Sequence, residues 1–147
     1  MKHARLFILG ALAALLFAVF SPALAQGPAA QNIVSITIHA DPADPAAVVI
    51  KVSPYVLDLT GKGPRQRIRF NLASDTFRFP EDAAKAIRVE NNHGQFSGNA
   101  HGQGPDFGKV ITIMDENSDA ALYKYSIEVE DASGQLLTID PLIKNGG

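Results

Sequence analysis

The chain contains 147 residues, with 13 basic and 15 acidic side chains and no cysteine. The lack of cysteine excludes disulfide bonds and thiol chemistry. The small acidic excess gives no general attraction to nucleic acid or to anionic lipid, because both favour basic surfaces. We therefore expect no nucleic-acid partner.

The N-terminal segment predicts export from the cytoplasm. A short basic start precedes an apolar run from Leu6 to Phe20, and Ala23-Leu24-Ala25 fits the small-x-small pattern of a cleavage site. A membrane-spanning helix needs about 20 apolar residues, which is more than this run supplies. We therefore expect residues 1–25 to be a cleavable signal peptide, with no membrane anchor after cleavage and a periplasmic or secreted location.

The predicted mature chain begins at Gln26 and has the size of one domain. Cleavage removes Lys2 and Arg5, which leaves 11 basic against 15 acidic side chains and a net charge of −4. A chain of this length can bury roughly two-thirds of its unfolded surface in a single core. We assign residues 26–32 to a flexible lead-in, 33–143 to a single β-sandwich domain and 144–147 to a flexible tail.

Short runs in which apolar and polar residues alternate predict β-strands along most of the mature chain. Turn residues such as Asp41-Pro42 and Ser53-Pro54 separate these runs. The expected strands cover residues 34–38, 48–52, 65–70, 77–79, 87–90, 110–114, 122–130 and 135–139. The segment 80–86 begins with Pro and two acids, which predicts one or two helical turns. This spacing of strands and turns indicates an all-β, antiparallel sandwich.

The alternation also predicts which side chains form the core. The inward face of each run is apolar, and a one-residue slip would turn that face to solvent. The residues expected to be buried are Ile36, Ile38, Ile50, Val52, Ile68, Phe70, Phe77, Phe79, Ile111, Ile113, Tyr123, Tyr125, Ile127 and Val129.

Asp119, Tyr123 and Tyr125 resemble the Asp-x-x-x-Tyr-x-Cys run of immunoglobulin-like sandwiches, where the first tyrosine forms a tyrosine corner. Here Tyr125 stands at the cysteine position and the chain has no tryptophan. The resemblance implies an Ig-like or cupredoxin-like sandwich without a cupredoxin metal site. It also implies that the Tyr123 ring is buried and that its hydroxyl bonds to backbone in the preceding turn. The wider pattern resembles small exported proteobacterial β-sandwich proteins, which implies no activity.

The segment 91–108 is rich in glycine and polar residues and predicts a long loop. Loops of this length in compact domains often carry function, because a rigid scaffold can present them to a ligand. We expect this loop to bind a protein or glycan partner. The candidate binding residues are His93, Gln95, Phe96, Asn99, His101 and Asp106.

A metal site is the second hypothesis for the same loop. The imidazoles of His93 and His101 would suit zinc or copper(II), with Asp106 or His39 as a third ligand. Two histidines eight residues apart form no recognised ligand spacing, however. The alternative is a solvated glycine-rich loop that holds its histidines by chance, and on balance we expect no cofactor.

The acidic run from Asp115 to Asp119 places oxygen atoms at alternate positions, like the start of an EF-hand calcium loop. Ala120 then stands where the loop requires glycine, and Ser126 where it requires glutamate. We therefore favour a turn in which Asp and Asn side chains bond to local backbone. A weak calcium site is the alternative.

Arg65, Arg67 and Arg69, with Lys62 nearby, predict a basic stripe on one face of a strand. The stripe could bind an anionic glycan, a lipid head group or an acidic partner. Charged side chains also protect edge strands against pairing with other chains. We favour edge protection, because the mature chain as a whole is acidic.

No catalytic grouping stands out in the sequence. The run Gly94-Gln95-Phe96-Ser97-Gly98 resembles a nucleophile elbow, but its serine is one position late and no α/β pattern surrounds it. We therefore expect a non-catalytic binding or interaction module. A metal-binding protein and an unrecognised hydrolase are the alternatives.

Overall fold

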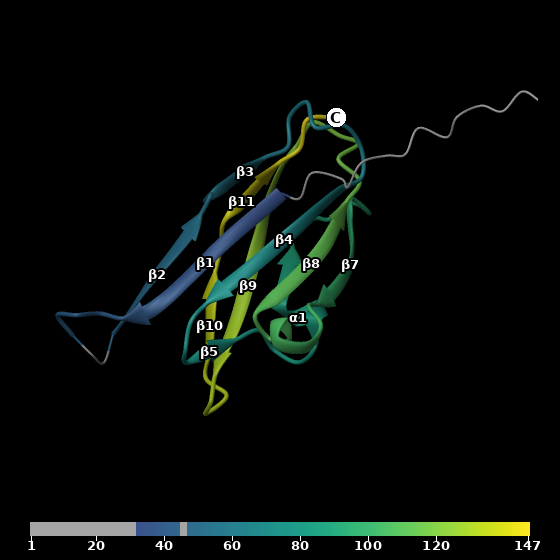
Figure 1. The fold of residues 1–147 in the computed structure, drawn as a ribbon. Helices are drawn as coiled ribbons and strands as arrows, with labels where there is room; N and C mark the ends of the chain where they lie inside the picture. The colour runs from purple at the N-terminus through teal and green to yellow at the C-terminus, as the bar shows by residue number, and fades with distance from the viewer. Residues whose placement is uncertain (1–31, 45–46) are drawn as a thin grey trace, which may run out of the picture.

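A computed structural model describes residues 32–44 and 47–147, so the predicted signal peptide and most of the lead-in lie outside the described residues. Two β-sheets pack against each other in this part of the chain (Figure 1). The first sheet has the strand order β2 (Val48–Ser53), β1 (Asn32–Ala40), β4 (Gln66–Ala73), β8 (Val110–Asp115) and β7 (Phe96–His101). Its five strands lie toward the viewer in Figure 1.

The second sheet is built around one long strand. Its order is β10 (Leu136–Ile139), β9 (Leu122–Asp131), β11 (Leu142–Lys144) and β3 (Val56–Asp58), and β5 (Phe77–Arg78) and β6 (Ile87–Val89) also pair with β9. A single helical turn, α1 (Ala83–Ala86), precedes β6. The side chain of Asp82 caps this turn by accepting a hydrogen bond from the amide of Ala84, as expected for a helix start. The predicted mostly β architecture is confirmed, and so is the short helix.

Both sheets are mixed, which corrects the prediction of an antiparallel sandwich. Strands β1 and β4 are parallel in the first sheet, and β3 and β11 are parallel in the second. The chain leaves the first sheet after β2, adds β3 to the second sheet and then returns to form β4 beside β1. The alternation of apolar and polar residues indicates which face of a strand is buried. The same alternation occurs in parallel and antiparallel pairs, so it does not predict the strand direction.

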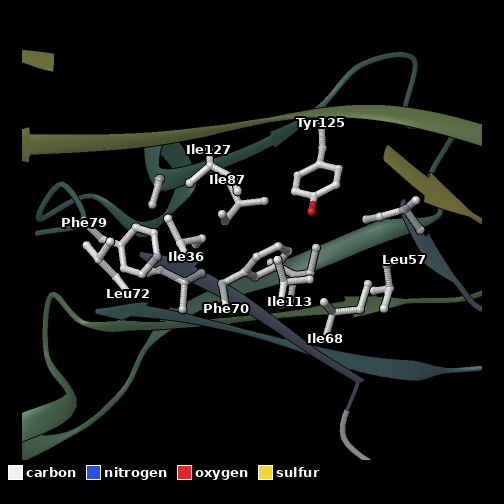
Figure 2. Packing of buried hydrophobic residues seen from close by; sticks show 14 of the residues in the cluster. Ile36, Leu57, Ile68, Phe70, Leu72, Phe79, Ile87, Ile113, Tyr125 and Ile127 are labelled. Atoms are coloured by element: carbon white, nitrogen blue, oxygen red, sulfur yellow. The ribbon is translucent and has the colours of Figure 1, made fainter. Parts of the chain in front are cut away.

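The core lies between the two sheets and matches the predicted set with two exceptions. Figure 2 shows Phe70 and Tyr125, from opposite sheets, facing each other in it; their rings meet edge to face, with centroids 5.6 Å apart. Ile50 was expected to be buried but is 37% exposed, and Val52 is only partly buried. Both lie on β2, the outermost strand of its sheet, where inward side chains have a neighbouring strand on one side only.

The folded domain begins earlier and ends later in the sequence than the predicted bounds of 33 and 143. Asn32, assigned to the lead-in, begins β1 and is buried. Lys144 belongs to β11, and Asn145 is buried with its amide bonded to the carbonyl of Ala121. Residues 144–146 therefore continue the hydrogen-bonded fold beyond the predicted domain end at residue 143. No helix among the described residues is long and apolar enough to cross a membrane.

Candidate functional site

The segment 91–108 is not the continuous loop that its composition predicts. Its centre forms β7, which pairs with β8 and has a bulge between Ser97 and Ala100. Gly98, inside the bulge, has a φ of +68°, a conformation that glycine adopts without strain. A 3-10 turn over Gly104–Asp106 follows. The segment is thus an edge strand with a short turn at each end.

Two of the predicted binding residues have structural roles instead. Phe96 is buried and packs edge to face against Tyr123, with ring centroids 5.0 Å apart. The side-chain amide of Asn99 donates to the carbonyls of Ala83 and Ile87 at 3.2 and 2.7 Å, which ties the helical turn to β7. Both side chains therefore contribute to the packing of the fold, and both also line a shallow hollow of about 340 Å³.

Gln95 holds two turns together. Its side-chain amide donates to the Ser118 hydroxyl at 2.9 Å, and its side-chain carbonyl accepts from the Ser118 backbone amide at 3.1 Å. The Gln95 backbone carbonyl also accepts from the Glu116 amide at 2.8 Å. This residue therefore joins the turn before β7 to the turn after β8. Ser97, the serine of the elbow-like run, is exposed on β7.

The structure separates the two histidines proposed as metal ligands. His93 is exposed in the turn before β7, in a shallow hollow of about 450 Å³ that Glu90 and Asp119 also line. His101 ends β7, where its Nε2 lies 2.9 Å from the carbonyl of Pro80 and its ring packs on Phe107. The six-residue strand β7, at about 3.3 Å per residue, lies between them, so the two imidazoles are at opposite ends of the strand and too far apart to share one ion.

Neither of the proposed third ligands, Asp106 and His39, completes a metal site with the two histidines. Asp106 forms an ion pair with Arg69, and His39 is on β1. Among the described residues, no group of three or more His, Asp or Glu side chains is arranged to hold a metal ion. The geometry therefore gives no support to the metal hypothesis.

The run from Asp115 to Asp119 forms a hydrogen-bonded turn, which is the interpretation that we preferred to a calcium loop. Asp115 is fully buried, and its Oδ1 accepts from the backbone amide of Asn117 at 2.8 Å. The side-chain amide of Asn145 donates to Asp115 Oδ1 at 3.1 Å and to Asp119 Oδ1 at 3.3 Å. Burial raises the pKa of Asp115, and the Asp119 carboxylate adds to this. The cluster anchors the C-terminal residues to the turn.

The tyrosine-corner expectation is half right. The Tyr123 ring is buried, but its hydroxyl donates to the Asp119 carboxylate at 2.5 Å and not to backbone. Burial and this hydrogen bond raise the pKa of Tyr123 to about 12. Tyr125 differs, because its hydroxyl points into the core (Figure 2), where it has no hydrogen-bond partner among the described residues.

We expect Tyr123→Phe and Tyr125→Phe to change stability in opposite directions. Loss of the Tyr123 hydroxyl removes a hydrogen bond to a charged acceptor and should cost about 1.5 kcal/mol. Loss of the Tyr125 hydroxyl removes a buried group without a partner, so this variant should be at least as stable as the wild type. Urea denaturation of the three proteins measures both effects. If Tyr123→Phe is as stable as the wild type, the Tyr123–Asp119 bond contributes nothing, and if Tyr125→Phe is destabilised, the Tyr125 hydroxyl has a partner in the folded protein.

The basic stripe lies on the central strand of the first sheet, which overturns the edge-protection interpretation. Strand β4 has β1 on one side and β8 on the other, so it has no free edge to protect. Arg67 and Arg69 alternate with the buried Ile68 and Phe70, and they therefore point away from the core. Arg65 precedes the strand, with a highly exposed side chain 3.9 Å from Glu116. The stripe is therefore part of the outward side of a central strand.

We call the outward side of the first sheet the open face. Its strands carry three basic side chains outward and no acidic one: Lys51, Arg67 and Arg69. Arg67 and Arg69 are two residues apart on one face, a separation of about 7 Å. The guanidinium of Arg67 and the amine of Lys51 have no hydrogen-bond or ion-pair partner among the described residues.

Arg69 joins the stripe to the segment 91–108. Its Nε donates to Asn71 Oδ1 at 2.8 Å, and its Nη2 donates to Asp106 Oδ2 at 3.0 Å. Both partners of the ion pair remain partly exposed, with side-chain exposures of 30% for Arg69 and 48% for Asp106. The structure thus combines two candidate surfaces that are 37 residues apart in sequence.

Polar and apolar side chains lie beside the two arginines, since Arg67 lies opposite Met114 on β8 and Arg69 lies opposite Ile33 on β1. Thr112 lies opposite Arg69 on β8, and Ser35 lies opposite Asn71 on β1. Thr37 lies opposite Lys51, where β1 meets β2. Hydroxyl and amide groups of this kind donate and accept hydrogen bonds, so the open face combines positive charge with polar groups of both types.

The outer side of the second sheet is different, because its basic side chains are paired. Each basic residue of β5, β6, β9 and β11 has an acidic partner: Arg78–Glu130, Arg88–Glu128, Lys124–Glu90, Lys124–Asp140 and Lys144–Asp58. Among the described strands, the cations without a partner therefore lie on the open face; Lys62 and Lys85, which lie outside the strands, also have no side-chain partner in the described part of the chain.

No protein-family description and no curated protein matches the chain.

Proposed function

We propose that this protein is an exported, non-catalytic binding module that holds an anionic ligand on the open face of its first sheet. The observation that carries the proposal is the pair Arg67 and Arg69 on the central strand, where the Arg67 guanidinium has no partner within residues 32–44 and 47–147. Arginine suits this role, because its planar fork binds carboxylate, sulfate or phosphate groups through two parallel hydrogen bonds. An unpaired guanidinium beside a second one is also electrostatically unfavourable until an anion lies between them.

A periplasmic or secreted location belongs to the same proposal, and the signal-like segment 1–25 supports it. An Ig-like or cupredoxin-like relationship is a further part of it. The buried ring of Tyr123 on β9 supports that relationship. The two parallel strand pairs count against a true immunoglobulin topology, whose sheets are antiparallel.

The test is retention of the mature protein on an immobilised polyanion such as dextran sulfate, eluted with a salt gradient. The mature chain has a net charge of −4, so retention would report a local basic surface and not the overall charge. We expect Arg67→Gln to elute at clearly lower salt. A charge-assisted hydrogen bond contributes about 1.5–3 kcal/mol, so affinity should fall by about tenfold or more.

Lys85→Gln provides the matched control, because it removes one positive charge from the exposed side chain of Lys85 on α1, away from the open face. It should elute with the wild type. Equal shifts for Lys85→Gln and Arg67→Gln would show that only net charge matters, and the open face would then have no special role.

A further inference from the structure

We infer that the ligand of the open face is an acidic glycan, and that Asp106 occupies the position of one of its charged groups in the free protein. This inference rests on the proposed function and adds the ligand class and a competing internal group. Three observations carry it: the incomplete ion pair of Arg69, the fixed turn that presents Asp106, and the side chains around the arginines.

The ion pair of Arg69 leaves binding capacity unused. One carboxylate oxygen of Asp106 receives a single bond from Nη2, while Nε is held by Asn71. A guanidinium has five N–H donors and binds a carboxylate best through two parallel bonds. Since the pair is half exposed, water screens it and it contributes little to stability. A ligand anion with better geometry can therefore replace the Asp106 carboxylate at small cost.

The backbone around Asp106 is fixed, so only its side chain needs to move. The Asp106 carbonyl accepts from the Lys109 amide at 3.0 Å, and its own amide donates to the Gln103 carbonyl at 3.2 Å. A Cβ on Gly102 would lie 2.5 Å from the Asp106 Cβ, so the close packing of this turn requires glycine. The turn also covers Val110, which points outward on β8 yet is buried. Rotation of one side chain would free Arg69 without unfolding the turn.

The remaining side chains of the open face favour a glycan over a protein or a membrane. Ser35, Thr37 and Thr112 match the hydroxyl groups of sugars, which both donate and accept. Protein interfaces are enriched in aromatic residues, Met and Arg at their centre and depleted in serine and lysine. The described strands of the open face carry Arg67, Arg69 and Met114 outward, but no outward aromatic side chain. Membrane-surface binding requires apolar side chains that insert among the lipids. Among the outward residues of the described strands of this sheet, the only large hydrophobic that is clearly exposed is Ile33.

Isothermal titration with an acidic oligosaccharide tests the inference. The probe is an oligogalacturonate, and its methyl ester is the neutral control with the same sugar ring. A heparin oligosaccharide provides the sulfated counterpart. We expect binding of both acidic glycans and at least tenfold weaker binding of the methyl ester. Arg67→Gln should weaken binding by about tenfold or more, and Asp106→Asn should strengthen it severalfold.

Asp140→Asn is the control for the change in net charge, because it removes the same charge on the side of the second sheet. It should leave affinity unchanged. Asp106→Ser is a second variant without the carboxylate, and circular dichroism melts confirm that each variant is folded. If neither Asp106 variant binds more tightly than Asp140→Asn, Asp106 does not compete with the ligand.

Two further probes separate this inference from the proposed function. If a polyglutamate peptide or vesicles rich in phosphatidylglycerol bind through Arg67 and the glycans do not, the open face is an anion site but its ligand is not a glycan. If Arg67→Gln changes the binding of none of these probes, the proposed function itself fails.

Discussion

Phe70→Ala should lower the free energy of unfolding by about 3–5 kcal/mol, because it leaves a cavity in the centre of the core. Phe70 is fully buried on β4, the central strand of the first sheet. Its ring meets Tyr125 of the second sheet edge to face, an arrangement that stabilises beyond the buried area alone. The residue therefore contributes to the contact between the two sheets, and the surrounding strands cannot close the gap without shifting.

Ile50→Ala is the matched control for this prediction. Ile50 lies on the inward side of β2, opposite Ile38, but it is 37% exposed at the outermost strand. Its truncation removes less buried surface and leaves no closed cavity, so we expect a loss of about 1 kcal/mol. Guanidinium denaturation measures both variants. A loss below 1 kcal/mol for Phe70→Ala would mean that β4 presents its other face to the core.

Asp115→Asn should stabilise the protein at neutral pH, by about 2 kcal/mol, although it removes a charge from a hydrogen-bonded cluster. Asp115 is fully buried, and its Oδ2 has no hydrogen-bond partner in the described part of the chain. The carbonyl oxygen of Asn145, whose amide binds the other Asp115 oxygen, also has none. An asparagine at position 115 keeps the acceptor that binds Asn117 and supplies a donor, where the charged carboxylate offers only acceptors.

The effect of this substitution should depend on pH in a defined direction. Burial raises the pKa of Asp115 above its usual value of 3.8, so the folded state binds this proton more tightly than the unfolded state does. The stabilisation from that proton is complete below about pH 4 and is lost as pH rises through the raised pKa. The advantage of Asp115→Asn over the wild type should therefore be small at pH 4 and grow toward pH 7.

Asp119→Asn is the control, because it changes a second carboxylate of the same cluster. Both carboxylate oxygens of Asp119 accept a hydrogen bond, one from Tyr123 and one from Asn145. A neutral amide in place of this carboxylate therefore weakens these hydrogen bonds. We expect this variant to be less stable than the wild type at pH 7. Urea titrations at several pH values distinguish the two cases. If Asp115→Asn is destabilising at pH 7, the buried carboxylate is better satisfied than its hydrogen bonds indicate.

The position and the buried side of β4 along the chain can be predicted from its sequence, but its place in the sheet cannot. The alternation of arginines with Ile68 and Phe70 identifies β4 and its buried side from the sequence alone. Whether that strand lies at an edge or in the centre depends on which strands pair with it. The partners of β4 come from residues 32–37 and 110–115, and no local signal names them.

The sequence by itself determined the β class, the inward face of most strands and the aromatic centre of the core, because these depend on a period of two along the chain. Only the tertiary structure decided the parallel pairings, the edge strand inside the glycine-rich segment 91–108 and the anchoring of residues 144–146. Glycine and asparagine are poor strand formers, so β7 exists because β8 offers its hydrogen-bonding groups beside it. The ion pair of Arg69 with Asp106 arises in the same way, since distant segments meet only when the sheets have formed.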